Sequence, residues 1–226
     1  MKIAVFGTGT VGRTMAAGLV SLGHSVIIGT RDPAKTLAQT EPDRMGNPPF
    51  SAWKEQNPQV TLGTFAEAAA QGELLVNATN GSGSVAAMSA AGAENLSGKV
   101  LLDISIPLDF SSGMPPSLFV SNTDSLAEQI QRAFPGTKVV KSLNTVTAAL
   151  MVNPRQIGGG DHSMFVSGND SAAKDAVCDL LRSFGWTDII DLGDLTAARG
   201  MEMYLPLWLR LWGAVGTGML NVRVVR

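Results

Sequence analysis

Three glycines near the start of the chain have the spacing of a phosphate-binding turn. Lys2–Phe6 has the apolar character of a buried strand, Gly7, Gly9 and Gly12 follow it as G-x-G-x-x-G, and a helical pattern covers 11–22. In this context the first glycine permits a tight turn, the second lets the backbone approach a pyrophosphate, and the third lets the helix pack on the strand. The amides of the turn would face the anion at the positive end of the helix dipole. The residues predicted to bind it are Gly7, Thr8, Gly9, Thr10, Val11 and Gly12.

The end of the next predicted strand indicates which dinucleotide binds. Ser25–Ile28 is followed by a Gly-Thr-Arg tripeptide and lacks the acidic residue that usually binds the ribose 2′-hydroxyl of NAD. Thr30 can donate a hydroxyl to a 2′-phosphate, Arg31 can offer a bidentate fork, and Lys35 follows one turn later. Asp32 could repel that phosphate or simply cap the helix that the following proline opens. The sequence therefore favours NADP(H) over NAD(H).

Two further strands end in polar loops. Asn77-Ala-Thr-Asn-Gly81 follows one strand and Asp103-Ile-Ser-Ile-Pro107 follows the next. Because ligands of open α/β sheets bind outside the carboxyl ends of the strands, these loops should flank the ribose and nicotinamide. The Asn-Gly pair is explained equally well as a turn. The cofactor-binding candidates in these loops are Ala78, Thr79, Asn80 and Ile104.

Short β-rich runs alternate with helical patterns along the chain. The predicted strands are Lys2–Phe6, Ser25–Ile28, Leu74–Asn77, Val100–Ile104, Lys138–Leu143, Ser163–Ser167 and Asp188–Leu192, and Asp170–Phe184 is predicted to be a helix. This alternation predicts an α/β fold, a Rossmann-type doubly wound, mostly parallel sheet with a small C-terminal helical cap. We expect an NADP-binding domain over 1–145. A small subdomain over 146–226 would extend the sheet and cap the site.

Composition excludes several classes of function. The chain has 226 residues, 45% of them hydrophobic, and a formal net charge of -2, which argues against nucleic acid as a partner. The single cysteine, Cys178, excludes an internal disulfide and fits a reducing cytoplasm. The apolar segment 205–222 carries Arg210 and several glycines, so we expect a core helix or a dimer surface rather than a membrane span.

Residues Glu41–Pro58 interrupt the alternation with four prolines around Phe50 and Trp53. We interpret them as a long loop. Loops of this length in compact domains are often binding loops, although an inert surface insertion is as common. The two aromatic residues favour a packed loop.

The sequence offers no obvious acid catalyst. Its two histidines, His24 and His162, have no catalytic context, no metal-ligand cluster or Gly-x-Ser-x-Gly turn is present, and Tyr204 is the one tyrosine. Reduction of a ketone normally needs a proton donor at the reacting oxygen. Hydride exchange between two redox cofactors needs mainly the alignment of two flat rings. The small residues over 147–149 would allow such stacking, with the C-terminal helices closing over the cleft.

Five segments together resemble one family. They are Gly7–Gly12, Gly29–Arg31, Asn122–Gln129, Lys141–Thr145 and Gly200–Trp208. The chain resembles, nearly end to end, the NADPH-dependent coenzyme F-420 reductases, and in particular a bacterial branch of them. These enzymes pass a hydride between nicotinamide C4 and C5 of an 8-hydroxy-5-deazaflavin. The resemblance implies NADP(H) as cofactor, coenzyme F-420 as second substrate and a homodimer. It also implies that Thr8, Gly9, Thr10 and Val11 hold the pyrophosphate, Thr30, Arg31 and Lys35 the 2′-phosphate, Ala78 and Thr79 the nicotinamide side, and that Ala148 lines the ring pocket.

The chain departs from this family where archaeal members carry histidine followed by threonine. Here Asn144 precedes Thr145, and asparagine cannot titrate. We take both residues as positioning candidates, although Asn144 could equally be a turn residue that satisfies backbone groups. An NADPH-dependent reductase of a small imine, ketone or quinone, and a non-catalytic NADP sensor, remain alternatives. The C-terminal arginines, Arg199, Arg210, Arg223 and Arg226, could meet the deazaflavin's anionic tail or lie in solvent.

Overall fold

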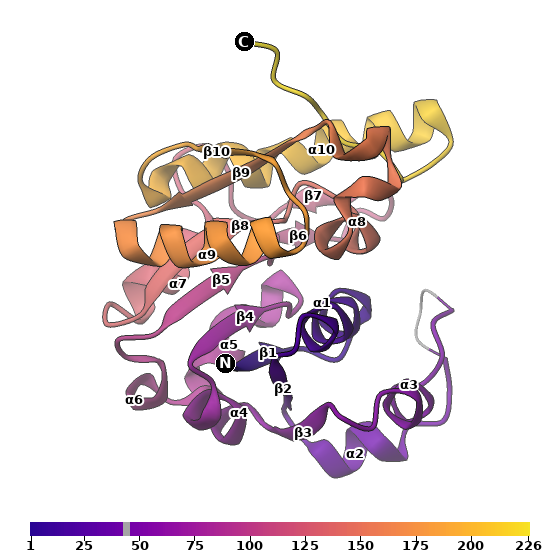
Figure 1. Cartoon of the computed structure of the whole chain (residues 1–226), viewed down its shortest axis with the longest axis vertical. Helices are drawn as coiled ribbons and strands as arrows, with labels where there is room; N and C mark the ends of the chain where they lie inside the picture. The colour runs from indigo at the N-terminus through magenta and orange to yellow at the C-terminus, as the bar shows by residue number, and fades with distance from the viewer. Residues whose placement is uncertain (43–45) are drawn as a thin grey trace.

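The computed structural model describes residues 1–42 and 46–226, and within them one large sheet organises the chain (Figure 1). The sheet has eight strands in the order β10-β9-β8-β5-β4-β1-β2-β3. Its strands are β1 (Lys2–Phe6), β2 (Ser25–Thr30), β3 (Thr61–Thr64), β4 (Leu74–Asn77), β5 (Val100–Asp103), β8 (Lys138–Ser142), β9 (Ser163–Gly168) and β10 (Asp188–Asp191). Neighbouring strands are parallel except β8 and β9, which are antiparallel. The prediction of a Rossmann-type, mostly parallel sheet is confirmed.

Helices cover both faces of this sheet. They are α1 (Thr10–Ser21), α2 (Pro33–Ala38), α3 (Phe50–Gln56), α4 (Phe65–Gln71), α5 (Gly81–Ala91), α6 (Ala93–Leu96), α7 (Leu126–Ala133), α8 (Ala148–Val152), α9 (Ser171–Ser183) and α10 (Ala198–Val215). Short 3-10 turns lie at Pro154–Gln156, Gly158–Gly160 and Leu195–Ala197, and β6 (Leu108–Asp109) pairs with β7 (Ser117–Leu118) in a separate ribbon.

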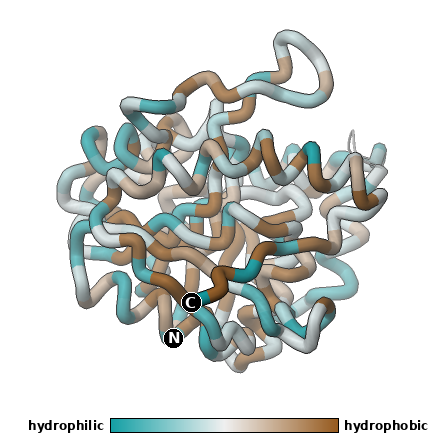
Figure 2. The backbone as a smooth tube through the Cα atoms, turned by 90° about the horizontal axis from the view of Figure 1, so that it is seen from above, coloured by the Kyte–Doolittle hydropathy of each residue, from teal (hydrophilic) through white to brown (hydrophobic). Residues whose placement is uncertain are grey.

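Two apolar clusters explain why these elements form. One lies between the sheet and α1, α3, α8 and α9, and the other between the sheet and α4, α5 and α7. Because the central strands are covered on both faces, their sequences are nearly continuous apolar runs. Figure 2 shows hydrophobic stretches in the interior and hydrophilic ones mainly at the periphery. Removal of this apolar surface from water is the main force that holds the layers together.

Most of the predicted elements are present. Each of the seven predicted strands is found, with ends that differ by at most two residues from the prediction. The predicted helix after β9 is α9, and the Asp170 side chain caps it by accepting from the Ala173 amide at 2.8 Å. The strand β3 was not predicted, because it is a short edge strand that contains a glycine.

The interpretation of Glu41–Pro58 as a loop was wrong over Phe50–Gln56, which form α3. The helix forms because Phe50 is 2% exposed and packs on Trp53, with ring centroids 5.4 Å apart, so burial outweighs the neighbouring prolines. Residues 43–45 of this segment lie outside the described residues.

The C-terminal part joins the same sheet. β9 and β10 extend it beyond β8, and α10 lies along that end of the molecule (Figure 1). Among the described helices, none combines the length and the apolar character needed to cross a membrane.

Candidate functional site

The glycine turn between β1 and α1 has the geometry of an anion cradle. Gly7 has a φ of +113°, and a Cβ there would lie 2.6 Å from the Ala78 carbonyl oxygen. A Cβ on Gly12 would lie 2.1 Å from the Gly7 carbonyl oxygen. Gly9 differs, because its backbone is extended and a Cβ would meet nothing within 4 Å. Gly7 and Gly12 are thus required by the fold, whereas Gly9 leaves open space in front of the first amides of α1, as a bound pyrophosphate would need.

The residues predicted to bind a 2′-phosphate lie together at the end of β2. Asp32 caps α2, its carboxylate accepting from the Lys35 amide at 2.9 Å. Arg31 and Lys35 are exposed, and in the described part of the chain neither side chain forms an ion pair. The Thr36 hydroxyl donates to the Asp32 carbonyl at 2.8 Å, so the 3.0 Å contact between Thr30 and Thr36 is donated by Thr30. The two cations are therefore available to an anion, while the Thr30 proton is already engaged.

The loops after β4 and β5 are joined by a buried hydrogen-bond network. The Thr79 hydroxyl donates to Asn77 Oδ1 at 2.6 Å, and Asn77 Nδ2 donates to Asp103 Oδ1 at 2.8 Å. Ser105 donates to the same Asp103 oxygen through its amide at 3.2 Å and its hydroxyl at 2.7 Å. Thr79 is partly exposed, whereas Asn77 and Asp103 are fully buried. The network fixes the loops that were predicted to flank the nicotinamide.

Three other candidates in these loops have distinct environments. Asn80 caps α5 by accepting from the Ser82 amide at 3.3 Å, as the turn interpretation expects. Ala78 lies against the glycine turn and donates its amide to the Phe6 carbonyl at 2.9 Å. Ile104 is 4% exposed and belongs to the core, so its side chain packs inward.

Lys141 on β8 continues the network into the interior. Its ammonium lies 2.9 Å from Asp103 Oδ2 and 2.9 Å from Glu202 Oε1, and it also donates to the Ser105 carbonyl. The lysine side chain is 0% exposed. Burial alone would lower the pKa of the Lys141 ammonium, but the two carboxylates outweigh this effect and raise that pKa. With three acceptors for its three hydrogens, the ammonium is sequestered rather than free to donate a proton.

Glu202 ties the network to α10 and α7. Its carboxylate accepts from the Leu126 amide at 2.8 Å and the Ala127 amide at 3.2 Å, at the first turn of α7. Sequence reasoning missed this cluster of Asp103, Lys141 and Glu202. The available signal was a charged residue in each of three segments with apolar neighbours, Asp103 in β5, Lys141 in β8 and Glu202 in α10. Charged residues are rarely buried unless they are paired.

Asn144 and Thr145 follow β8 and are buried. Asn144 Nδ2 donates to the Met201 carbonyl at 2.8 Å, which matches the interpretation of a residue that satisfies backbone groups. Its Oδ1 is buried and has no hydrogen-bond partner within residues 1–42 and 46–226. The Thr145 hydroxyl lies 4.0 Å from the Met164 sulfur, and Ala148 begins α8 partly exposed.

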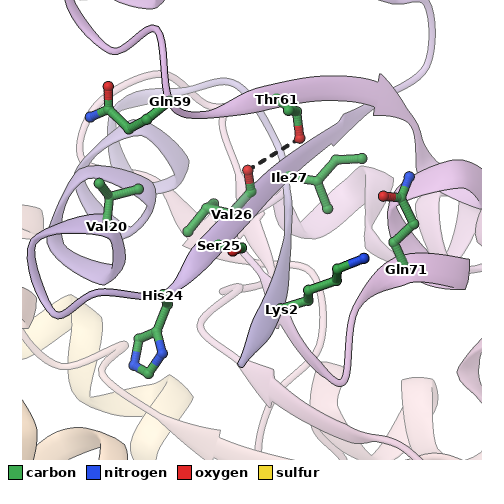
Figure 3. Close-up of a pocket in the computed structure, with 9 residues that line it drawn as sticks. All are labelled: Lys2, Val20, His24, Ser25, Val26, Ile27, Gln59, Thr61 and Gln71. Atoms are coloured by element: carbon green, nitrogen blue, oxygen red, sulfur yellow. Dashed lines mark hydrogen bonds between the residues drawn. The ribbon is translucent and has the colours of Figure 1, made fainter.

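Several other predicted groups lie away from this edge or are already paired. His162 contacts the Pro154 carbonyl at 2.9 Å and packs edge-on against Trp186, so its role is structural. His24 lines a hollow of about 340 Å³ at the amino ends of β1, β2 and β3 (Figure 3). The glycine turn follows the carboxyl end of β1, at the other edge of the sheet. Three of the C-terminal arginines form ion pairs, Arg199 with Glu128, Arg223 with Asp161 and Arg226 with Asp188. Across the described residues, no group of His, Cys, Asp or Glu could hold a metal ion.

Comparison with known proteins identifies the family. The family model described as NADP oxidoreductase, coenzyme F420-dependent, matches residues 2–107. A solved structure from Arthrobacter sp. FB24, described as a candidate F420-dependent NADP-reductase, is 62% identical over the whole of both chains with a TM-score of 0.96. The F420-dependent NADP reductase of Methanothermobacter marburgensis is 28% identical over 93% of this chain and 92% of its own length. Rat metalloreductase STEAP3 is 27% identical over 92% of this chain, which spans 38% of that longer protein. The chain therefore belongs to the family of coenzyme F420-dependent NADP oxidoreductases and is an NADP-dependent oxidoreductase.

Proposed function

We propose that this oxidoreductase transfers a hydride between NADP(H) and a deazaflavin of the coenzyme F420 type, with no side chain acting as an obligatory general acid. The observation that carries the proposal is the sequestration of Lys141, the lysine at the carboxyl edge of the central sheet, by Asp103 and Glu202. Exchange between two flat rings requires their alignment more than a proton donor. The full-length similarity to proteins described as F420-dependent NADP reductases supports this acceptor.

The residues present fit a bound NADP(H). The space in front of Gly9 and the unpartnered Asn144 Oδ1 are the features that support this fit. When bound, NADPH supplies the hydride. We propose that the pyrophosphate is held by the amides of Thr8–Val11 and the 2′-phosphate by Arg31 and Lys35. The nicotinamide side would be bordered by Ala78, Thr79, Asn80 and the backbone of Ile104, and the ring pocket by Ala148.

Asn144 and Thr145 are proposed to position the rings. Because Asn144 Nδ2 is held by a backbone carbonyl, its amide offers an acceptor oxygen, which would suit an N–H of a ring or carboxamide. Replacing either residue by Ala should lower turnover modestly through loss of position. Loss of a general acid would cost roughly a hundredfold or more.

The test is reduction of oxidised F420 by NADPH, followed through the deazaflavin absorbance. We expect an immediate absorbance change with the parent protein and none with Gly9→Val. Turnover of imines, ketones or quinones with no deazaflavin activity would favour the small-substrate reductase. NADPH binding without oxidation of any acceptor would favour a sensor.

We also propose that the chain acts as a homodimer and that 1–145 and 146–226 are its two functional parts. Exposed apolar side chains of α10 support a dimer surface, with Leu207 56%, Trp212 42% and Val215 61% exposed. Sedimentation should give the mass of two chains, and Trp212→Glu should shift it toward one.

A further inference from the structure

The segment Asn47–Phe50 is tied to the glycine turn by Arg13 of α1. The Arg13 guanidinium donates through Nε to the Thr8 carbonyl at 2.8 Å and through Nη1 to the Pro48 carbonyl at 2.6 Å. It also lies over the Phe50 ring, 5.5 Å from the ring centroid. One side chain therefore links the turn between β1 and α1 to a segment that comes after α2.

Asn47 contacts the turn directly. Its Nδ2 donates to Thr10 Oγ1 at 2.9 Å. Thr10 is exposed, is the first residue of α1 and lies next to Gly9, where the space is open. Because the Thr10 oxygen accepts this bond, its own hydrogen remains to be donated to an acceptor in front of the turn. A phosphate oxygen at the first amides of α1 is such an acceptor.

The segment is anchored at its far end. Phe50 is buried in the core beside Trp53, and α3 packs on α2, the helix that follows Arg31. The same short stretch of chain therefore touches both the glycine turn and the helix of the proposed 2′-phosphate site. This anchoring lets Asn47 reach Thr10 without a large loss of conformational freedom on binding.

We propose that Asn47 and Arg13 are positioning residues for the pyrophosphate of NADP(H). Arg13 holds the segment Asn47–Phe50 against the glycine turn, and Asn47 directs the Thr10 hydroxyl hydrogen toward the phosphate. This inference rests on the proposed dinucleotide site and deepens it. It gives the segment Asn47–Phe50 a role in recognising the whole dinucleotide rather than its adenosine half alone.

The experiment compares two ligands by calorimetric titration of the full chain. NADPH carries the pyrophosphate, whereas adenosine 2′-monophosphate carries the adenine and 2′-phosphate alone. Asn47→Ala should weaken NADPH binding about five- to tenfold, the effect of one hydrogen bond, and leave the nucleotide monophosphate unchanged. Asn47→Asp should weaken NADPH further, because a carboxylate cannot donate and repels phosphate. Arg13→Lys should also weaken NADPH binding, because a lysine ammonium lacks the planar fork with which Arg13 reaches the carbonyls of Thr8 and Pro48.

Three controls separate a positioning role of Asn47 from a general loss of structure. Asn57→Ala removes a matched amide of the same region, which donates to the Trp53 carbonyl at 2.8 Å, and should leave both affinities unchanged. Asn47→Ala should have no further effect on NADPH affinity in a Thr10→Val background, because the hydroxyl that it orients is gone. Thr10→Ser, which keeps the hydroxyl, should keep the effect of Asn47→Ala.

The outcomes distinguish the possible failures. Equal weakening of both ligands by Asn47→Ala, or no weakening of NADPH, would overturn the positioning role of this residue. The positioning role would also be overturned if the effects of Asn47→Ala and Thr10→Val on the free energy of NADPH binding were fully additive. If the parent protein bound adenosine 2′-monophosphate but not NADPH, or neither ligand, the proposed dinucleotide site itself would be wrong.

Discussion

Replacing Lys141 by Met would leave Asp103 and Glu202 buried without the ammonium that lies 2.9 Å from each of them. Removal of one partner from a buried ion pair costs about 3 to 5 kcal/mol, because the remaining charge is uncompensated. Here two carboxylates would remain, each still accepting hydrogen bonds from backbone or side-chain donors. We therefore expect a loss of about 3 to 5 kcal/mol in the free energy of unfolding at pH 7, a fall of roughly 6 to 20 °C in the melting temperature.

The pH dependence makes this prediction specific. Lys141→Met leaves buried carboxylates with no opposite charge beside them, and burial of this kind disfavours the charged form of a carboxyl group. A carboxyl group with a raised folded pKa destabilises the fold above that pKa, and the penalty disappears as pH falls below its unfolded value. The stability deficit of Lys141→Met should therefore narrow from pH 8 to pH 5. In the parent, the raised pKa of Lys141 means that its stabilisation is complete below pH about 10.4 and is lost only above it.

Urea unfolding of both proteins at several pH values provides the assay. Lys174→Met is the matched control, since Lys174 pairs with the half-exposed Asp191 at 2.8 Å, and it should cost at most about 1 kcal/mol. Adding Glu202→Gln to Lys141→Met should recover part of the loss by removing one unpaired charge. A deficit below about 1 kcal/mol that is also constant from pH 5 to pH 8 would refute the assignment of an essential buried cluster.

Three further changes test the site and its electrostatics. Gly9→Val should keep the melting temperature, because a Cβ there meets no protein atom within 4 Å, but should weaken NADPH binding by more than about a hundredfold, which calorimetry would detect as lost heat. Normal NADPH affinity would exclude the turn as the phosphate site. Arg31→Ala should weaken NADPH binding by about 1.5 to 3 kcal/mol and leave NADH nearly unchanged; equal losses would contradict the 2′-phosphate assignment. The Arg132 guanidinium, 2.7 Å from Asp124, holds the pKa of that carboxyl well below its usual value. The ionised Asp124 therefore stabilises the fold above pH about 3.9, and this contribution is lost as pH falls through the folded pKa. Arg132→Met should raise the Asp124 pKa in a carboxyl NMR titration and cost less than about 1 kcal/mol at pH 7 because the pair is partly exposed; an unmoved pKa would contradict the pairing.

The central sheet could be predicted from the sequence because its strands are buried on both faces. Runs such as Leu74–Asn77 need no long-range information, since continuous apolar character already indicates a covered strand. The edge strand β3 has no such signal, and α3 forms because tertiary burial of Phe50 outweighs the prolines around it. Local patterns therefore predicted the interior better than the periphery.

The candidate site also has a part that local sequence patterns predict and a part that depends on tertiary contacts. The glycine turn could be predicted because its spacing is local: Gly7 and Gly12 have no room for a side chain, and Gly9 leaves the space in front of the helix open. The joining of Asp103, Lys141 and Glu202 depends on which strand ends and helix meet in space, and no spacing in the sequence encodes that meeting. The contact of Asn47 with Thr10 was equally out of reach, because it depends on how the segment before α3 folds back on the glycine turn.

Single-turnover kinetics with NADPH deuterated at the transferred C4 position tests most directly whether a hydride passes from NADPH to a deazaflavin. We expect deuterium at C5 of the reduced deazaflavin, with a primary isotope effect on the step. We also expect that no single polar side chain among Asn144, Thr145 and Thr79 is indispensable. Loss of the label to water, or an essential side chain among these three, would contradict the acid-free transfer and favour the small-substrate reductase.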